Sequence, residues 1–333
     1  MLNYFCSCLN IIWIPIMNRF VLRSVKILFG ILQHVAPSLA GRIAFDLFRR
    51  TPHPGRMTDG EKRAVAFAQD FMQEARIHRL ASSRGRFVAY EFCKWGARRD
   101  GPTVLLIHGW GSRTEHMRGL AGALLQRGFR VVSLDLPGHG ASEGRVLDIA
   151  SAVAAVHATA QWLGPFDAMV GHSFGGAVAL NAVSGAISGI PPVPVRRMVM
   201  IASPNALPEL FSRFGRFIGL LEKTQGLLER HAEEIAGQPL TRFVGANQLR
   251  ELDIPTLVVH APDDREVSPQ DARALGRAGG HVSLVWARGL GHRRILAAPQ
   301  VAECVAAFIE SRRERKIPER TGGRAEERLP MAN

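Results

Sequence analysis

A serine set among glycines is the residue of this 333-residue sequence most able to do chemistry. It is Ser173, in the stretch GHSFGG at positions 171–176. An apolar run precedes it and small residues of a helix follow; a G-x-S-x-G turn between strand and helix lifts the serine hydroxyl above the sheet edge. A Cβ beside the serine would collide with the neighbouring helix or strand, so glycine is needed there. The motif occurs by chance in roughly one chain in ten of this length, so its partners must be found.

A serine hydroxyl is a poor nucleophile at neutral pH. It needs a base, a group that orients the base, and donors for the developing oxyanion. Asp263 and Asp264 follow an expected strand at 256–260, and His292 follows the last expected strand at 282–286. The order serine, aspartate, histidine is the one expected for a nucleophile on a strand–turn–helix. The residues alone leave Asp263 and Asp264 as alternative acids.

The elements that must position these side chains alternate between strands and helices. A capping box at Thr58 and Glu61 opens an early helix. Fully apolar stretches further on are typical of strands buried on both faces. Strands are expected at residues 86–95, 103–107, 130–134, 166–170, 197–202, 256–260 and 282–286. Repeated β-α units predict an α/β fold with a mainly parallel central sheet and helices on both faces.

One long segment interrupts this alternation. Apolar residues recur at helical spacing within it, so we expect a helical cap at about 203–252, over the carboxyl ends of the strands. The rest divides into an N-terminal apolar and basic helical extension at 1–57 and a main α/β domain at 58–310 that carries the cap. A basic tail at 311–333 is expected to be disordered.

The charge of the chain lies mostly at its two ends. The net charge is +13, of which +6 falls in residues 1–63 and +3 in residues 311–333. The nearly balanced middle argues against a nucleic-acid groove, so no nucleic-acid partner is predicted. The four cysteines have no metal-ligand spacing, and no phosphate-loop or dinucleotide motif is present, so we predict no metal and no cofactor. Scattered cysteines are typical of reduced thiols and indicate a cytoplasmic protein.

The N-terminal segment leaves three interpretations open. Residues 1–16 carry no charge, but they lack the basic start and the cleavage site of a secretory signal, and they fall short of the ~20 residues that span a bilayer. Met17 is an alternative start. Residues 18–34 predict an apolar helix with a basic edge. Residues 1–50 could then lie peripherally on the inner face of a membrane, pack on the domain, or pair two subunits in a homodimer.

Five motifs, in order, resemble those of the α/β-hydrolase fold family from about residue 85 to residue 310. They are HGWG, DLPGHGAS, GHSFGG, HAPDDREV and GLGH. The resemblance implies that Ser173 is the nucleophile and that His292 is the general base, later the acid. It favours Asp264 over Asp263 as the orienting acid, because Asp264 stands three residues before Val267 and matches the D-x-x-V pattern of the family.

The same resemblance implies roles for neighbouring residues. The oxyanion donors would be the backbone N–H groups of Phe174 and Trp110. We expect the helical cap at about 203–252 to follow the sixth strand of the sheet. Asp135 is expected to bond backbone amides. Structural roles are expected for His108, His139 and His172.

The predicted function is a serine hydrolase that cleaves a carboxylic ester, or a related acyl bond, through an acyl-enzyme on Ser173. An acyltransferase on the same triad is the alternative, because the triad does not distinguish water from another acceptor. A non-catalytic ligand-binding protein is less favoured, since all three members of the triad are present. The expected partner is a small-molecule acyl substrate, and the apolar cap favours an acyl or aromatic group of moderate size.

Overall fold

A single eight-stranded sheet forms the centre of the computed structural model, which describes residues 19–52, 57–93 and 101–311. Residues 312–333 of the tail expected at 311–333, and the uncharged residues 1–16, lie outside this part of the chain. The strands lie in the order β1-β2-β4-β3-β5-β6-β7-β8, and β3 to β8 are parallel, whereas β1 and β2 are antiparallel to their neighbours. Their bounds are β1 Arg76–Ser82, β2 Gly85–Phe92, β3 Thr103–Ile107, β4 Arg130–Asp135, β5 Ala168–His172, β6 Arg197–Ile201, β7 Thr256–His260 and β8 Val282–Trp286.

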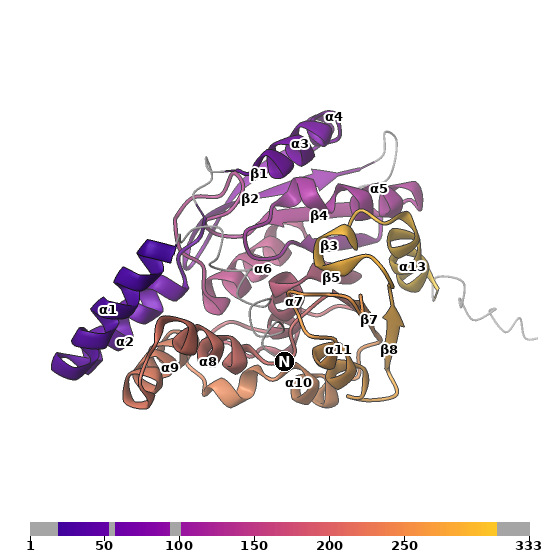
Figure 1. The fold of residues 1–333 in the computed structure, drawn as a ribbon. Coiled ribbons are helices and arrows are strands. Elements are labelled where there is room, and N and C mark those ends of the chain that lie inside the picture. The colour runs from indigo at the N-terminus through magenta and orange to yellow at the C-terminus, as the bar shows by residue number, and fades with distance from the viewer. Residues whose placement is uncertain (1–18, 53–56, 94–100, 312–333) are drawn as a thin grey trace, which may run out of the picture.

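Helices cover both faces of this sheet (Figure 1). On one face α6 and α7 pack against the strands, and on the other α5 and α13 do so. The apolar strands β3, β5, β6 and β7 are buried along their whole length, as sheet strands covered on both sides must be. The helices are α1 Arg19–Val35, α2 Pro37–Phe48, α3 Asp59–Phe67, α4 Gln69–Gln73, α5 Arg118–Gln126, α6 Ile149–Leu163, α7 Phe174–Ser184, α8 Leu207–Ile218, α9 Glu222–Ala236, α10 Gly245–Glu251, α11 Pro269–Gly276, α12 Gly291–Arg294 and α13 Pro299–Glu310.

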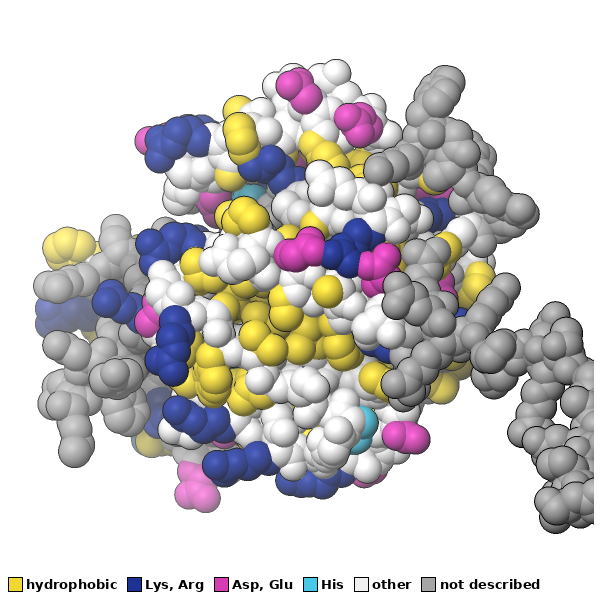
Figure 2. Space-filling model, turned by 90° about the vertical axis from the view of Figure 1, so that its right-hand side faces the viewer, with side chains coloured by type: hydrophobic (Ala, Val, Ile, Leu, Met, Phe, Trp, Pro, Cys, Tyr) yellow, Lys and Arg dark blue, Asp and Glu magenta, His cyan; other side chains and the backbone are white. Residues whose placement is uncertain are grey.

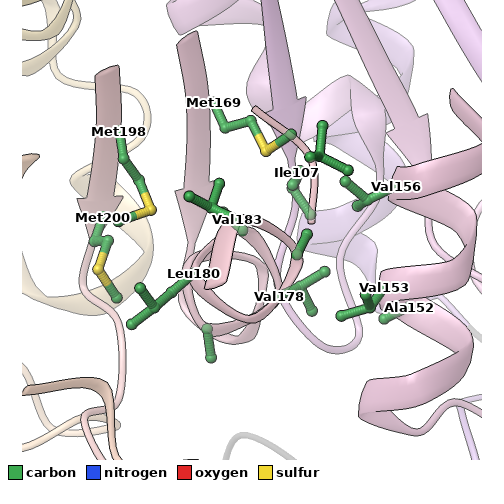
Figure 3. Packing of buried hydrophobic residues seen from close by; sticks show 14 of the residues in the cluster. Ile107, Ala152, Val153, Val156, Met169, Val178, Leu180, Val183, Met198 and Met200 are labelled. Carbon is green, nitrogen blue, oxygen red and sulfur yellow. The ribbon is translucent and has the colours of Figure 1, made fainter. Parts of the chain in front are cut away.

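The larger of the two cores lies between the sheet and the α6–α7 pair (Figure 3). Met169, Met198 and Met200 project from β5 and β6 towards α7, and Leu180 and Val183 of α7 face them. All five side chains are buried. Because α7 begins immediately after the serine, this packing fixes the direction in which the serine turn leaves the sheet. The predicted α/β fold with a mainly parallel sheet is confirmed.

A helical insertion, residues 203–252, lies between β6 and β7, and it contains α8, α9, a short 3₁₀ helix at Leu240–Phe243, and α10. The first two helices of the described residues, α1 and α2, pack against α8 and α9 and lie at the left of Figure 1. A third apolar cluster joins the two groups, with Phe29 and Phe48 from one and Phe214 from the other. The predicted helical insertion and extra N-terminal helices are therefore present. No helix among the described residues is long and apolar enough to cross a membrane.

One edge of the sheet differs from the sequence expectation. β1 was not expected, because its residues are largely polar and its side chains are exposed or half-buried. It nevertheless pairs with β2 over seven residue pairs and forms one edge of the sheet. Figure 2 shows the face of the molecule at the right of Figure 1, where hydrophobic side chains gather near the middle and basic side chains lie beside them.

Candidate active site

The serine turn joins β5 to α7 with no intervening loop. β5 ends at His172 and α7 begins at Phe174, so Ser173 alone makes the turn. Its backbone has φ 55° and ψ −124°, a conformation that a residue with a side chain rarely adopts. The N–H of Ser173 donates to the carbonyl oxygen of Ile201, at 2.8 Å, and helps to hold this strained geometry. The hydroxyl therefore stands at the carboxyl edge of the sheet.

Close approach of the backbone explains the glycines on either side of the turn. A Cβ on Gly171 would lie 2.2 Å from the carbonyl oxygen of Gly175. A Cβ on Gly175 would lie equally close, 2.2 Å, to the carbonyl oxygen of Ile107 on β3. Neither backbone atom can move aside without disturbing a buried strand or helix. The sequence G-x-S-x-G is thus a packing requirement of this turn.

The structure brings together the three side chains that the sequence motifs single out. The Nε2 atom of His292 lies 3.0 Å from the Oγ atom of Ser173, and its Nδ1 atom lies 2.8 Å from the Oδ2 atom of Asp264. All three residues are buried, although they come from turns after three different strands. An imidazole placed between a hydroxyl and a carboxylate can take the hydroxyl proton and be stabilised as it becomes charged.

The carboxylate of Asp264 is held by its own turn. Its Oδ1 atom accepts hydrogen bonds from the N–H groups of Glu266, at 2.7 Å, and Val267, at 2.9 Å. Burial favours the protonated acid, but the hydrogen bond and charge of His292 and these two N–H donors outweigh it and lower the pKa of Asp264. Asp263 points elsewhere, because its carboxylate accepts from the N–H of Gly289 at 3.0 Å. Of the two alternative acids, Asp264 is the one in contact with the imidazole.

The two expected oxyanion donors flank the serine. Phe174 follows it at the first turn of α7, and Trp110 lies in the loop after β3. That loop is close, because a Cβ on Gly109 would be 2.9 Å from the Cβ of Ser173. The rings of Trp110 and Phe174 meet edge to face, with their centroids 5.6 Å apart. The indole Nε1 of Trp110 is buried and has no hydrogen-bond partner among the described residues, a feature that the sequence did not indicate.

The buried histidines around the site have structural partners, as expected. His108 accepts from the N–H of Leu136 at 2.9 Å, and His139 accepts from the N–H of Gly111 at 2.9 Å. Burial lowers the pKa of each imidazole to about 3, so both are neutral near pH 7. Asp135 accepts from the N–H groups of Thr114 and Ala141, each at 2.8 Å, which confirms that it bonds backbone amides.

An apolar pocket opens beside the serine. Its wall includes Ser173, Trp110 and Phe174 from the sheet side, and residues of α8 from the insertion. It also includes Phe45 and Phe48 of α2, which the sequence analysis did not connect with the site. The ring centroid of Phe48 lies 4.5 Å from that of Phe211 on α8, so two segments distant in sequence meet over the pocket. The further lining residues include Leu147, Leu207, Leu210, Leu240 and Phe243.

A second, wider groove reaches the same serine from the other side. It runs from Ser173 and His292 to Val21 and Val25 on α1. Arg293, which pairs with Glu266 at 3.0 Å, also lines it. Among the residues that the structure describes, no group of three or more His, Cys, Asp or Glu side chains could hold a metal ion.

Known proteins resemble this chain in sequence and fold. Residues 104–304 match the sequence profile of the alpha/beta hydrolase family. The chain is 28% identical over 287 residues to a non-heme chloroperoxidase of Streptomyces lividans, which covers 70% of this chain and 99% of that protein. It is 29% identical over 224 residues to a bifunctional esterase/perhydrolase of Acinetobacter calcoaceticus, covering 52% of this chain and 78% of that one.

Solved structures agree on the fold. An esterase from Pyrococcus furiosus superposes with a TM-score of 0.55 at 18% identity, covering 79% of this chain and 96% of that one. The sheet order, the serine turn and the profile match over most of the domain lead to one conclusion. The chain belongs to the alpha/beta hydrolase family and is an enzyme of the hydrolase type.

Proposed function

We propose that this protein hydrolyses carboxylic esters through an acyl-enzyme on Ser173. The observation that carries the proposal is the continuous contact from Ser173 through His292 to Asp264, with distances of 3.0 Å and 2.8 Å. A buried serine on a strained turn has no structural need for an imidazole within hydrogen-bond distance. The same distance is what a general base requires in order to activate a hydroxyl.

The reaction follows from this geometry in two halves. His292 takes the proton of Ser173 through Nε2 while Oγ attacks the ester carbonyl carbon, and the negative charge that forms on the carbonyl oxygen faces the N–H groups of Phe174 and Trp110. The imidazolium then gives its proton to the departing alkoxide, so an alcohol leaves and the acyl group stays on the serine. Water then attacks the acyl carbon while His292 takes its proton; the bond from that carbon to Oγ breaks, the imidazolium returns the proton to Oγ, and the carboxylic acid leaves. Asp264 holds Nδ1 and stabilises the imidazolium.

The pocket indicates which part of the ester binds where. Its lining is mostly aromatic and aliphatic, with Phe48 and Phe211 in contact across it. Burial of an apolar acyl chain there contributes about 0.8 kcal/mol for each methylene group. We infer that the acyl group occupies this pocket and that the alcohol leaves through the groove on the other side of Ser173.

A series of p-nitrophenyl esters of increasing acyl length tests the proposal. Ser173→Ala and His292→Ala are each expected to lower kcat by about a thousandfold or more, with an unchanged circular dichroism spectrum. Asp264→Asn is expected to lower it by a similar order, whereas the matched variant Asp263→Asn should retain most activity. Equal losses in Asp263→Asn and Asp264→Asn would contradict the role given to Asp264.

Labelling with a fluorophosphonate probe tests the nucleophile independently of substrate choice. The probe should attach covalently to Ser173 in the folded protein and should fail to attach to Ser173→Ala. A wild-type protein that folds, takes no label and hydrolyses none of the esters would support the alternative of a binding protein on a hydrolase fold.

Perhydrolysis is a second candidate, favoured by the names of the relatives, a chloroperoxidase and an esterase/perhydrolase. Here hydrogen peroxide replaces water as the acceptor: its oxygen attacks the acyl carbon, His292 takes the proton, and a peracid leaves Ser173. The experiment is to add hydrogen peroxide to the ester assay and to measure peracid against free acid. Peracid that forms only with the wild-type protein supports this reaction, and free acid alone counts against it.

A further inference from the structure

We propose that α1, together with the exposed side of α2, binds the surface of an anionic lipid bilayer and so places the groove of the active site at that surface. The proposal that the protein docks on a bilayer depends only on the surface residues of α1 and α2. The claim that the substrate is an ester dissolved in the bilayer rests also on the proposed esterase function.

The first observation is that α1 is apolar on two opposite faces. One face packs inward: Phe29 is 1% exposed and belongs to the cluster shared with α8 and α9. The opposite face has no protein partner among the described residues that would bury it, and its side chains recur at helical spacing from Phe20 to Val35. Phe20 is 83% exposed, Ile31 64% and Val35 78%. The other exposed apolar residues of the two helices include Ile27, Leu28, Leu39 and Ile43.

The second observation is that α1 is held in a fixed orientation. The side chain of Gln33 is buried, donates to the carbonyl oxygen of Gly219 at 3.2 Å, and accepts from the N–H of Leu221 at 2.8 Å. Both partners lie in the turn between α8 and α9. A helix that packed only through apolar contacts could rotate to hide its outer face. This two-point hydrogen bond opposes such a rotation and keeps Ile31 and its neighbours outward.

The third observation concerns charge, and it selects the partner. Arg23 and Lys26 of α1 and Arg42 of α2 are exposed, and α1 contains no acidic residue. A second copy of this surface would bring like charges together without a carboxylate on α1 to pair with them. An anionic lipid surface complements the basic side chains, and each basic side chain near the surface raises the affinity about fivefold. The apolar side chains can insert between the lipid headgroups.

The fourth observation links this surface to the serine. The wide groove that contains Ser173 and His292 is also lined by Val21 and Val25 of α1. α1 carries apolar side chains along its length together with Arg23 and Lys26, and an amphipathic helix of this kind lies in the plane of the interface. A helix lying in that plane would bring the mouth of the groove to the headgroup layer. The substrate class that suits this arrangement is an ester with a long apolar acyl chain, delivered from the bilayer.

Vesicle sedimentation with the full chain tests the docking surface. The probes are vesicles of phosphatidylcholine alone and vesicles that also contain phosphatidylglycerol. Wild type and Ser173→Ala are both expected to sediment with the anionic vesicles. Ile31→Asp and the double change Arg23→Glu with Lys26→Glu should each lower binding about tenfold or more. The matched controls are Ile77→Asp, at a 55% exposed isoleucine on β1, and Arg277→Glu, at an exposed arginine beyond α11; both should bind normally.

The outcomes separate docking from catalysis. The α1 variants should hydrolyse a short water-soluble ester at the wild-type rate and lose rate only on an ester embedded in anionic vesicles. Vesicle binding by Ser173→Ala together with an inactive wild type would overturn the esterase and leave the docking surface standing. Vesicle binding that is unchanged in Ile31→Asp would overturn the docking surface. Light scattering that shows a dimer in wild type and a monomer in Ile31→Asp would do so too, since a second copy would then cover this face.

Discussion

The Nε2 atom of His172 lies 3.0 Å from the backbone carbonyl oxygen of His292, and the two imidazole rings are 4.9 Å apart. The residue before Ser173 therefore holds the loop that carries His292. Burial lowers the pKa of His172 to about 3, and the nearby His292 adds to this, so the ring stays neutral with Nε2 as the donor. His172 is thus a positioning residue that couples the serine turn to the position of His292.

Removing this hydrogen bond should slow the reaction without weakening substrate binding. We expect His172→Phe to lower kcat by about tenfold to a hundredfold, because a displacement of about 1 Å in a catalytic group has effects of this size, and to leave KM nearly unchanged. His172→Gln, whose amide N–H can reach the same carbonyl, should recover part of the loss. Steady-state kinetics on one p-nitrophenyl ester measure both. A purely structural role would instead show as a lower melting temperature with unchanged kcat.

Phe48 should set the length of acyl group that the pocket accepts. Phe48→Ala is expected to move the best substrate of the ester series to a longer acyl chain, since it removes one wall of the pocket. Phe29→Ala is the matched control: it also removes a buried ring from the α1–α2 cluster, at a similar cost of about 3 kcal/mol or more, but Phe29 does not line the pocket. A shift of preference in both variants would indicate general loosening of the cluster.

Asp271, on α11 beside the pocket, should make the protein less stable as the pH rises. Burial raises the pKa of Asp271 to about 6, and Glu209 adds to this, whereas the N–H of Asn205 opposes it. An acid whose pKa is higher in the folded state loses protons on unfolding, so stability falls between about pH 4 and pH 6 and stays lower above that. The cost above pH 6 is about 3 kcal/mol at most.

Asp271→Asn should remove this dependence, because the amide keeps the bond from Asn205 without a charge. The melting temperature of wild type minus that of the variant should become more negative as the pH rises from 4 to 7. Asp253→Asn, at an exposed carboxylate on the surface, is the control and should track wild type at every pH. A difference in melting temperature between wild type and Asp271→Asn that stays the same at every pH would contradict the raised pKa of Asp271.

The contact of α2 with α9 should depend on Gly41. A Cβ there would lie 2.6 Å from the Cβ of Leu227 and 3.1 Å from the backbone nitrogen of Leu228, so Gly41→Ala should force the helices apart. Gly30→Ala is the matched change on α1, where nothing lies within 4 Å of the new atom, and it should stabilise the helix by about 1 kcal/mol. Chemical denaturation should separate the two variants by about 2 kcal/mol, and equal stabilities would contradict the close packing.

The residues of the site were predictable because each follows a strand in a short motif. Ser173 stands among glycines that its turn requires, and the spacing of Asp264 from Val267 is explained by the hydrogen bond that the N–H of Val267 donates to the Asp264 carboxylate. These requirements are local, so they are visible in the sequence. The hydrogen bond from His172 to His292 joins residues 120 positions apart, and nothing in the motif around His172 indicated it.

The orientation of α2 shows where local periodicity fails. The sequence after Ser38 predicts a helix with Leu39, Ile43, Leu47 and Phe48 in one apolar stripe, yet Leu39 and Ile43 are 49% and 36% exposed, and only Phe48 of the four is buried. The rest of the buried side is made by Ala40, Ala44 and Phe45, together with Gly41 against α9. Small residues allow two helices to approach closely, and this tertiary preference outweighs the size of the side chains. The face that a helix buries depends on its partner, which no single sequence segment contains.

Two aromatic walls of the pocket beside Ser173 come from α2 and α8, and neither helix carries Ser173, Asp264 or His292. Ser173, Asp264 and His292 lie in turns that follow strands of the sheet, so their alignment does not depend on the distance between α2 and α8. Substitutions in α2 or α8 could therefore retune which chain lengths are accepted while the rate-determining machinery stays intact. The substrate specificity of such a scaffold can therefore change while the residues that would carry out the reaction stay the same.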